Sequence, residues 1–121
     1  AGARGLDVSP AWFSWVGQLP ALELITSLGV EAIHAHDVSL ANAFRAGVAL
    51  PAADSAIVSV AVDAGAAAAL AEHRVAAATR AGRLRLSFHL YNDVGDVGAA
   101  IEAVGAHVRP DDVVGAPGRV R

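Results

Sequence analysis

The clearest pattern along the chain is a strict alternation of apolar and polar side chains over residues 83–89. Leu84, Leu86 and Phe88 alternate with arginine, serine and histidine, and this period of two is typical of a β-strand with one buried face. Residues 57–62 are rich in Val and Ile and predict a second strand. Residues 75–82 fit either a short strand with a loop or the continuation of a helix.

Two stretches in the first half of the chain have apolar residues at helical spacing. The first, residues 15–28, contains Pro20, which is tolerated near a helix start or at a kink, and Gly29 follows as a C-cap. The second is amphipathic and ends at Gly47, with Arg45 in its last turn, where a cation stabilises the helix dipole.

Two further helices are predicted in the second half. Asp63 is placed to N-cap a run of alanines that extends to about His73. Asp93 is placed to N-cap the last helix, with Asp96 completing a capping box. The expected buried face of this last helix consists of Val97, Ala100, Ile101 and Val104.

The order of these elements predicts an α/β fold. Strands separated by helices favour a two-layer sandwich, in which helices cover one face of a small, mainly antiparallel sheet. Residues 1–10 are expected to form an irregular arm, residues 11–108 the folded domain, and residues 109–121 a loose tail.

Composition narrows the possible functions. The 121 residues include no Cys and no Lys, and nine arginines are outnumbered by twelve acidic residues, for a net charge of -3. Disulfides and thiolate chemistry are excluded, and we expect neither nucleic-acid binding nor docking on an anionic membrane. Apolar runs are too short to cross a bilayer and there is no secretory signal, so the expected location is the cytoplasm.

Arg83 and Arg85 are the strongest candidate binding residues. Side chains two positions apart on a strand point to the same face, and fork-shaped guanidinium groups suit a carboxylate or a phosphate. The alternative is that both arginines only solvate the outer face of an edge strand.

Other candidates are weaker. His34, His36 and Asp37 invite a metal site, but helical positions two apart do not share a face, so surface histidines are the better interpretation. His89 follows the two arginines and could contact an anion or act as a base, although a structural hydrogen bond is more typical. No serine has the context of a catalytic nucleophile.

An aromatic cluster, Trp12, Phe13 and Trp15, lies beside the expected N-terminal arm, at the start of the first predicted helix. It could anchor that helix in the core. Alternatively it covers an interface, where aromatic side chains concentrate.

Two motifs together resemble a known enzyme family. The segment GRLRLSFHLYNDVGDVGAAIEAV, residues 82–104, resembles the end of class V aminotransferases, the pyridoxal-phosphate family that includes cysteine desulfurases and kynureninase-like enzymes. The segment SPAWFSWVGQLPALELITSLGVEAIHAH, residues 9–36, is similar to the helix that leads into the small domain of that family. The resemblance extends over residues 7–104.

The resemblance implies the C-terminal small domain of a homodimeric enzyme whose large domain holds pyridoxal phosphate. In the motif Arg-x-Ser-x-x-x-Tyr-Asn, the family's arginine binds the α-carboxylate of the amino-acid substrate, and this position is Arg85. A family hydroxyl that contacts the cofactor phosphate of the partner subunit corresponds to Ser9, although Val8 replaces the glycine that normally precedes it.

The absence of lysine limits what the chain does by itself. The family attaches its cofactor to a lysine of the large domain, and this chain has none. We therefore expect the isolated chain to be inactive, with transamination, desulfuration or lyase chemistry requiring a large domain supplied elsewhere. A freestanding, noncatalytic α/β module that binds a partner protein or a small carboxylate is the alternative.

Overall fold

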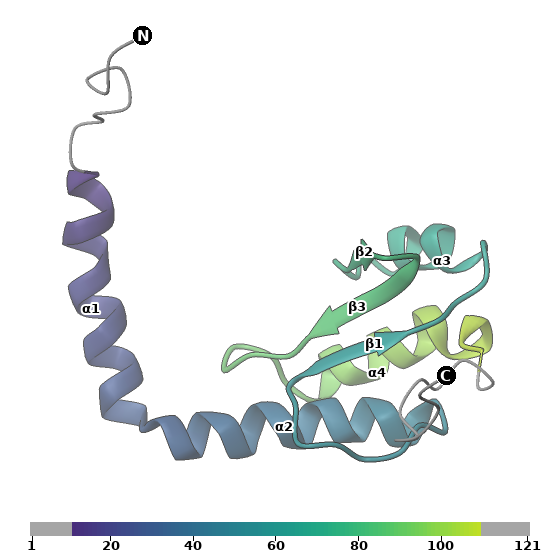
Figure 1. Ribbon diagram of the computed structural model, residues 1–121, viewed down its shortest axis with the longest axis horizontal. Coiled ribbons are helices and arrows are strands. Elements are labelled where there is room, and N and C mark those ends of the chain that lie inside the picture. The colour runs from purple at the N-terminus through teal and green to yellow at the C-terminus, as the bar shows by residue number, and fades with distance from the viewer. Residues whose placement is uncertain (1–10, 110–121) are drawn as a thin grey trace, which may run out of the picture. The chain divides into compact units, whose positions relative to one another are not determined.

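The computed structural model describes residues 11–109, so the predicted arm 1–10 and nearly all of the predicted tail lie outside the described residues. It shows an α/β fold in which four helices accompany a small, open, three-stranded antiparallel sheet (Figure 1). The elements are α1 (Trp12–Leu28), α2 (Val30–Gly47), β1 (Ile57–Val60), α3 (Ala66–Glu72), β2 (Ala78–Arg80), β3 (Arg83–Ser87) and α4 (Val94–Val104), followed by a 3-10 turn (Gly105–His107). The described chain divides after Ala32 into two compact units.

The first unit consists mainly of α1, which is apolar on all sides. It begins three residues earlier than predicted, includes Pro20 in its interior, and ends at Gly29, whose positive φ of 84° and N–H bond to the Ile25 carbonyl (3.0 Å) confirm the C-cap. No residue of α1 is buried, and Phe13 is 95 % exposed. The aromatic cluster thus finds no core within its own unit, and both interpretations, a core anchor and an interface, stay predictions.

The length and composition of the helices bear on membrane insertion. Among the described residues, no single helix is long and apolar enough to cross a membrane. Taken together, α1 and α2 are long and apolar enough by length and composition, but a bend separates the two helices.

The sheet of the second unit has the strand order β1-β3-β2, so β3 is the central strand and is hydrogen-bonded on both sides. Residues 75–82, which were ambiguous in sequence, form a loop and the short strand β2. Ala81 and Gly82 both have positive φ, at 50° and 73°, the backbone that suits a two-residue hairpin. β1 and β3 each stop two residues earlier than the pattern predicts.

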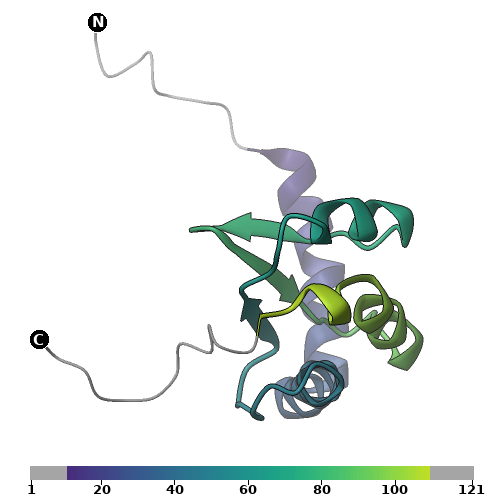
Figure 2. The ribbon, with the colours of Figure 1, turned by 90° about the vertical axis from the view of Figure 1, so that its right-hand side faces the viewer.

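The core lies between one face of the sheet and the helices of the second unit. Figure 2 shows α3 and α4 on the same side of the strands. Phe44 of α2 is fully buried, and its ring lies 6.0 Å from that of Phe88. The buried apolar residues are Leu40, Ala41, Phe44, Val48, Val58, Val60, Ala66, Leu70, Leu84, Leu86, Phe88, Val97, Ala100, Ala103 and Val104.

Gly47 is the last residue of α2, as predicted, and it also has a packing role. A side-chain carbon added there would collide with Ile101 of α4. The chain turns two residues later, at Ala49, which adopts a positive φ of 57°. Gly47 thus permits the close contact between α2 and α4 that an alanine-rich core requires.

The two predicted N-caps have different outcomes. Asp93 and Asp96 form the expected capping box: Asp93 accepts bonds from the N–H groups of Gly95 (2.7 Å) and Asp96 (3.2 Å), and Asp96 accepts from the N–H of Asp93 (3.1 Å). Asp63 is not an N-cap, because α3 begins later and its N-cap is Gly65.

Asp63 stabilises the turn that precedes α3 instead. Its carboxylate accepts the N–H of Gly65 at 2.8 Å and lies 2.8 Å from Nδ1 of His107. The carboxylate thereby joins this turn to the chain segment after α4. Val62, which was expected to belong to β1, pairs with Val108 in an isolated bridge at the same place.

Arg45 joins α2 to the loop that leads into β1. Its side chain is only 6 % exposed. Its guanidinium donates to the Asn42 side chain (2.9 Å) and to the carbonyls of Ser55 (3.0 Å), Ile57 (2.9 Å) and Ala53 (3.5 Å). Sequence reasoning assigned Arg45 only to the helix dipole and missed this buried network.

Candidate functional site

The face of the sheet that turns away from the core is the candidate site, and we call it the open face. Directly paired residues on neighbouring strands share a face, so the strand register defines its members. They are Ile57, Ser59, Ala78, Arg80, Arg83, Arg85 and Ser87. The described helices α3 and α4 lie on the other side of the sheet (Figure 2).

The open face is basic although the chain as a whole is acidic. Three of its seven residues are arginines and none is an aspartate or glutamate. Arg80 pairs directly with Arg83 across the hairpin, and Ala78 pairs with Arg85. Like charges directly opposite each other on a sheet are destabilising, by roughly 0.2–1 kcal/mol, so this arrangement has a cost unless an anion offsets it.

Arg83 and Arg85 share a face, as the alternation predicted, but their surroundings differ. Arg83 reaches across to β1, where its Nε donates to Ser59 Oγ (3.3 Å) and its Nη2 to the Ser59 carbonyl (3.2 Å). Arg85 is half-buried, and among residues 11–109 its guanidinium has neither a hydrogen bond nor an ion pair. Of the two strand arginines, Arg85 has all of its guanidinium donors available, whereas Arg83 keeps only those that do not contact Ser59.

A shallow hollow of about 400 Å³ lies beside Arg85. Its other lining residues, all small, are Ala76, Ala77, Ala78 and Ser87. Small neighbours leave room for a ligand to reach the guanidinium. The backbone that carries Arg85 belongs to the central strand and is held on both sides. The site can therefore hold an anionic group by charge-assisted hydrogen bonds.

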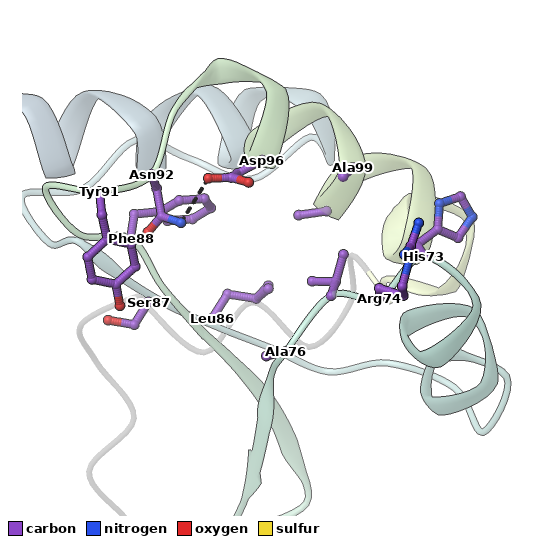
Figure 3. A pocket seen from close by; sticks show the side chains of 12 residues that line it. His73, Arg74, Ala76, Leu86, Ser87, Phe88, Tyr91, Asn92, Asp96 and Ala99 are labelled. Atoms are coloured by element: carbon purple, nitrogen blue, oxygen red, sulfur yellow. Dashed lines mark hydrogen bonds between the residues drawn. The ribbon is translucent and has the colours of Figure 1, made fainter.

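A second hollow, of about 310 Å³, lies between β3, α4 and the end of α3 (Figure 3). His73 and Arg74 stand at one end of it, and Tyr91, Asn92 and Asp96 stand at the other. Sequence reasoning did not anticipate this hollow.

The polar groups of this second hollow are largely engaged in holding its own walls. Asn92 donates to Asp96 at 2.9 Å, and its side-chain oxygen accepts the N–H of His89 at 2.9 Å. Asp96 also completes the capping box of α4. This corner therefore shapes the junction between β3 and α4, and it offers fewer unengaged groups than the open face.

The histidines of α2 do not come together as a metal site. His34 Nε2 lies 2.9 Å from the carboxylate of Asp54, whereas His36 Nε2 lies 3.1 Å from the Asn92 carbonyl. Across the part of the chain that the structure describes, no cluster of three potential metal ligands is found. The interpretation of these residues as separate helix histidines agrees with the structure.

His89 lies beyond the end of β3, and its ring stacks on Tyr91 with the ring centroids 5.1 Å apart. The expected structural hydrogen bond is made by its backbone N–H rather than by its ring. Within residues 11–109 the ring makes no hydrogen bond, so its contribution here is packing.

Asp37 is an unexpected feature of α2. Its side chain is buried, at 7 % exposure, and its Oδ1 has no hydrogen-bond partner within the described range. Burying a carboxylate oxygen without a donor is costly. Nothing in the sequence distinguishes Asp37 from the exposed polar residues around it.

One predicted contact and one arginine of the open face remain to be placed. Ser9, the candidate contact to a cofactor phosphate, lies outside the described residues. Arg80 was not predicted, because residues 75–82 were ambiguous; its only signal is its place before the Ala-Gly turn. Comparisons with protein families, curated proteins and solved structures found no match for this chain.

Proposed function

We propose that this chain is the small domain of a class V aminotransferase-like enzyme and that Arg85 binds the α-carboxylate of its amino-acid substrate. The observation that carries the proposal is the unengaged guanidinium of Arg85 on the open face. The two-layer arrangement, with helices on one side of a small sheet, is compatible with such a domain.

Three properties make Arg85 suitable for this role. β3 is bonded to strands on both sides, so the backbone under Arg85 is held in place. Its neighbours Ala78 and Ser87 are small. Arg83 is tied to Ser59 and does not compete for the same ligand. A planar guanidinium that stays charged is well matched to a carboxylate, which it can hold through two parallel bonds.

The residues of this chain do not by themselves provide a site for pyridoxal phosphate. The sequence has no lysine to which the cofactor could be attached, and Ser9 lies outside the described residues. In the proposed enzyme, the large domain supplies the lysine and the cofactor chemistry. This chain contributes the orientation of the substrate.

The test compares Arg85→Ala with Arg74→Ala in an enzyme reconstituted from this chain and a large domain that carries the cofactor lysine. We expect Arg85→Ala to weaken amino-acid binding by about 100-fold, since hydrogen bonds between charged groups are worth up to roughly 3 kcal/mol. The binding of an amine that lacks the carboxylate should change little. Arg74→Ala removes the same charge at a position away from the open face, and it should leave both affinities unchanged.

The proposal is wrong if Arg85→Ala leaves the affinity for the amino acid unchanged. It is also wrong if the amine and the amino acid lose affinity equally, because the effect would then not depend on the carboxylate. Both affinities can be measured as binding isotherms, so the test does not depend on knowing which reaction the enzyme catalyses.

A freestanding, noncatalytic binding module is the second candidate. The exposed apolar surface of α1 is compatible with an apolar partner protein, and the basic open face is compatible with an acidic one. Self-association separates the two proposals: a surface that normally meets a large domain should make the chain dimerise or aggregate when it is alone. A monomer that persists at high concentration in sedimentation experiments would favour the freestanding module.

A further inference from the structure

The open face has a charge that its own sheet does not balance. Arg80, Arg83 and Arg85 lie on neighbouring positions of β2 and β3, and none of the seven residues of the face is acidic. The rest of the chain has an excess of acidic residues, because the net charge is -3 despite these three arginines. The open face is therefore positively charged, whereas the chain as a whole has a negative net charge.

The pairing of Arg80 with Arg83 indicates that a balancing anion has to come from outside the sheet. The two residues are direct cross-strand partners, where like charges repel. Arg83 does not turn away from the sheet to relieve this, since it is held over β1 by Ser59. A carboxylate placed between the two guanidinium groups would convert the repulsion into two favourable pairs.

We propose that the open face is an interaction surface for an acidic polypeptide segment, whose Asp or Glu side chains bind Arg80 and Arg83. The inference does not rest on the role proposed for Arg85. It commits to a polypeptide because the face is shallow: the hollow at Arg85 is bounded by small residues on the same surface, so a partner must supply the opposing wall.

The spacing of Arg80 and Arg83 suits an extended segment. The two residues are direct cross-strand partners, so their Cβ atoms lie about 4.5–5.5 Å apart. Alternate side chains of an extended partner are about 6.6 Å apart, and the long arginine side chains can adjust to that separation. Ser59, Ala78 and Ser87, which lie among the arginines, are small enough to let such a segment approach the sheet.

A nucleic acid is a poorer fit to the same charges. Single-stranded nucleic acids are held by aromatic stacking together with a basic groove, and none of the seven residues of the open face is aromatic. The negative charge of the remaining surface would also repel a phosphate backbone that extended beyond the face.

The test measures binding of a fluorescently labelled peptide of alternating Glu and Ser to the purified chain, by fluorescence anisotropy at low and at physiological salt. We expect saturable binding that weakens as salt rises. The double variant Arg80→Gln/Arg83→Gln should lose at least tenfold in affinity, whereas Arg74→Gln, with one charge removed outside the face, should lose less than twofold.

A charge-reversed variant keeps the test informative. Arg80→Glu/Arg83→Glu should stop binding the acidic peptide and should bind a peptide of alternating Lys and Ser instead. The thermal melting of each variant establishes that it is folded before its affinity is compared.

Three results would overturn the inference. They are the absence of saturable binding to the acidic peptide, an equal loss of affinity in Arg74→Gln, and tighter face-dependent binding of a single-stranded oligonucleotide of equal charge. Arg85 is intact in every variant, so these variants should keep their amino-acid affinity. Failure of the parent chain to bind the peptide would overturn this inference alone, whereas unchanged amino-acid affinity in Arg85→Ala would overturn the proposed function alone.

Discussion

Arg45 and the arginines of the open face lie in the same small unit, yet their surroundings are opposite. Arg45 is buried, and the loop between α2 and β1 supplies acceptors for its guanidinium. Arg85 has no partner among the described residues, and Arg80 directly faces another arginine. The comparison indicates that a charged side chain stabilises this fold only where the chain supplies its partners. Where the chain supplies none, the side chain is available to a ligand.

The largest expected effect is the loss of Arg45. Arg45→Leu keeps the apolar stem but removes the donors to the carbonyls of Ser55 and Ile57 and to Asn42. Because a hydrogen bond to a charged group contributes about 1.5–3 kcal/mol, we expect the free energy of unfolding to fall by roughly 3 kcal/mol. Urea denaturation followed by circular dichroism measures the change.

Two matched variants sharpen this result. Arg45→Lys keeps the charge but lacks the fork that reaches several acceptors, so its loss should be intermediate. Arg74→Leu removes an exposed arginine and should change stability by less than about 0.5 kcal/mol. If the Arg45 and Arg74 variants were equally stable, the distinction between engaged and unengaged arginines would have no energetic basis.

The next effect has the opposite sign and concerns Asp37. Its buried Oδ1 lacks a donor within residues 11–109, so one oxygen of this carboxyl group is buried without the partners that Arg45 has. Asp37→Asn preserves the shape and removes the charge. We expect the free energy of unfolding to rise by about 1 kcal/mol, measured as a higher melting temperature at neutral pH.

Asp54→Asn is the control for this prediction, because Asp54 is exposed and pairs with His34. It should leave the melting temperature nearly unchanged. A clear destabilisation by Asp37→Asn would show that the carboxylate has a favourable interaction beyond the contacts described here.

Local patterns predicted most of the fold because they depend on residues close in sequence. The alternation around Leu84 predicted β3 and its two faces, and Asp93 with Asp96 predicted the capping box of α4. Asp63 was misassigned because its carboxylate is also near His107, 44 residues away in the sequence. A competing partner of that kind leaves no local pattern.

The candidate site was predictable only in part for a related reason. Arg83 and Arg85 are neighbours on one strand, so their shared face followed from the sequence. Arg80 joins them through the pairing of β2 with β3, which depends on the turn geometry of Ala81 and Gly82. Gly82 suits the second position of such a turn, but Ala81 is not the Asn, Asp or Gly that normally precedes it. The cluster of three arginines therefore emerged only in three dimensions.

The smallest effect is the pH dependence contributed by Asp63, which has its partners but remains accessible to solvent. The N–H of Gly65, and then His107, lower the pKa of the Asp63 carboxyl below its ordinary value. The pKa of Asp63 is lower in the folded state than in the unfolded state. The carboxylate therefore contributes to the free energy of unfolding at neutral pH, and this contribution is lost as the pH falls through the folded-state pKa. We expect the melting temperature to begin to decrease below about pH 5.

Asp63→Asn tests this assignment. The variant should be less stable than the parent at pH 7. The difference should narrow as the pH falls, because protonation removes from the parent the carboxylate charge that the variant already lacks. Glu72→Gln removes an exposed carboxylate that accepts no hydrogen bond from the described residues, so its melting curve should stay parallel to that of the parent. A parallel curve for Asp63→Asn as well would show that exposed partners do not stabilise this charge, leaving burial as the property that distinguishes Arg45 from the open face.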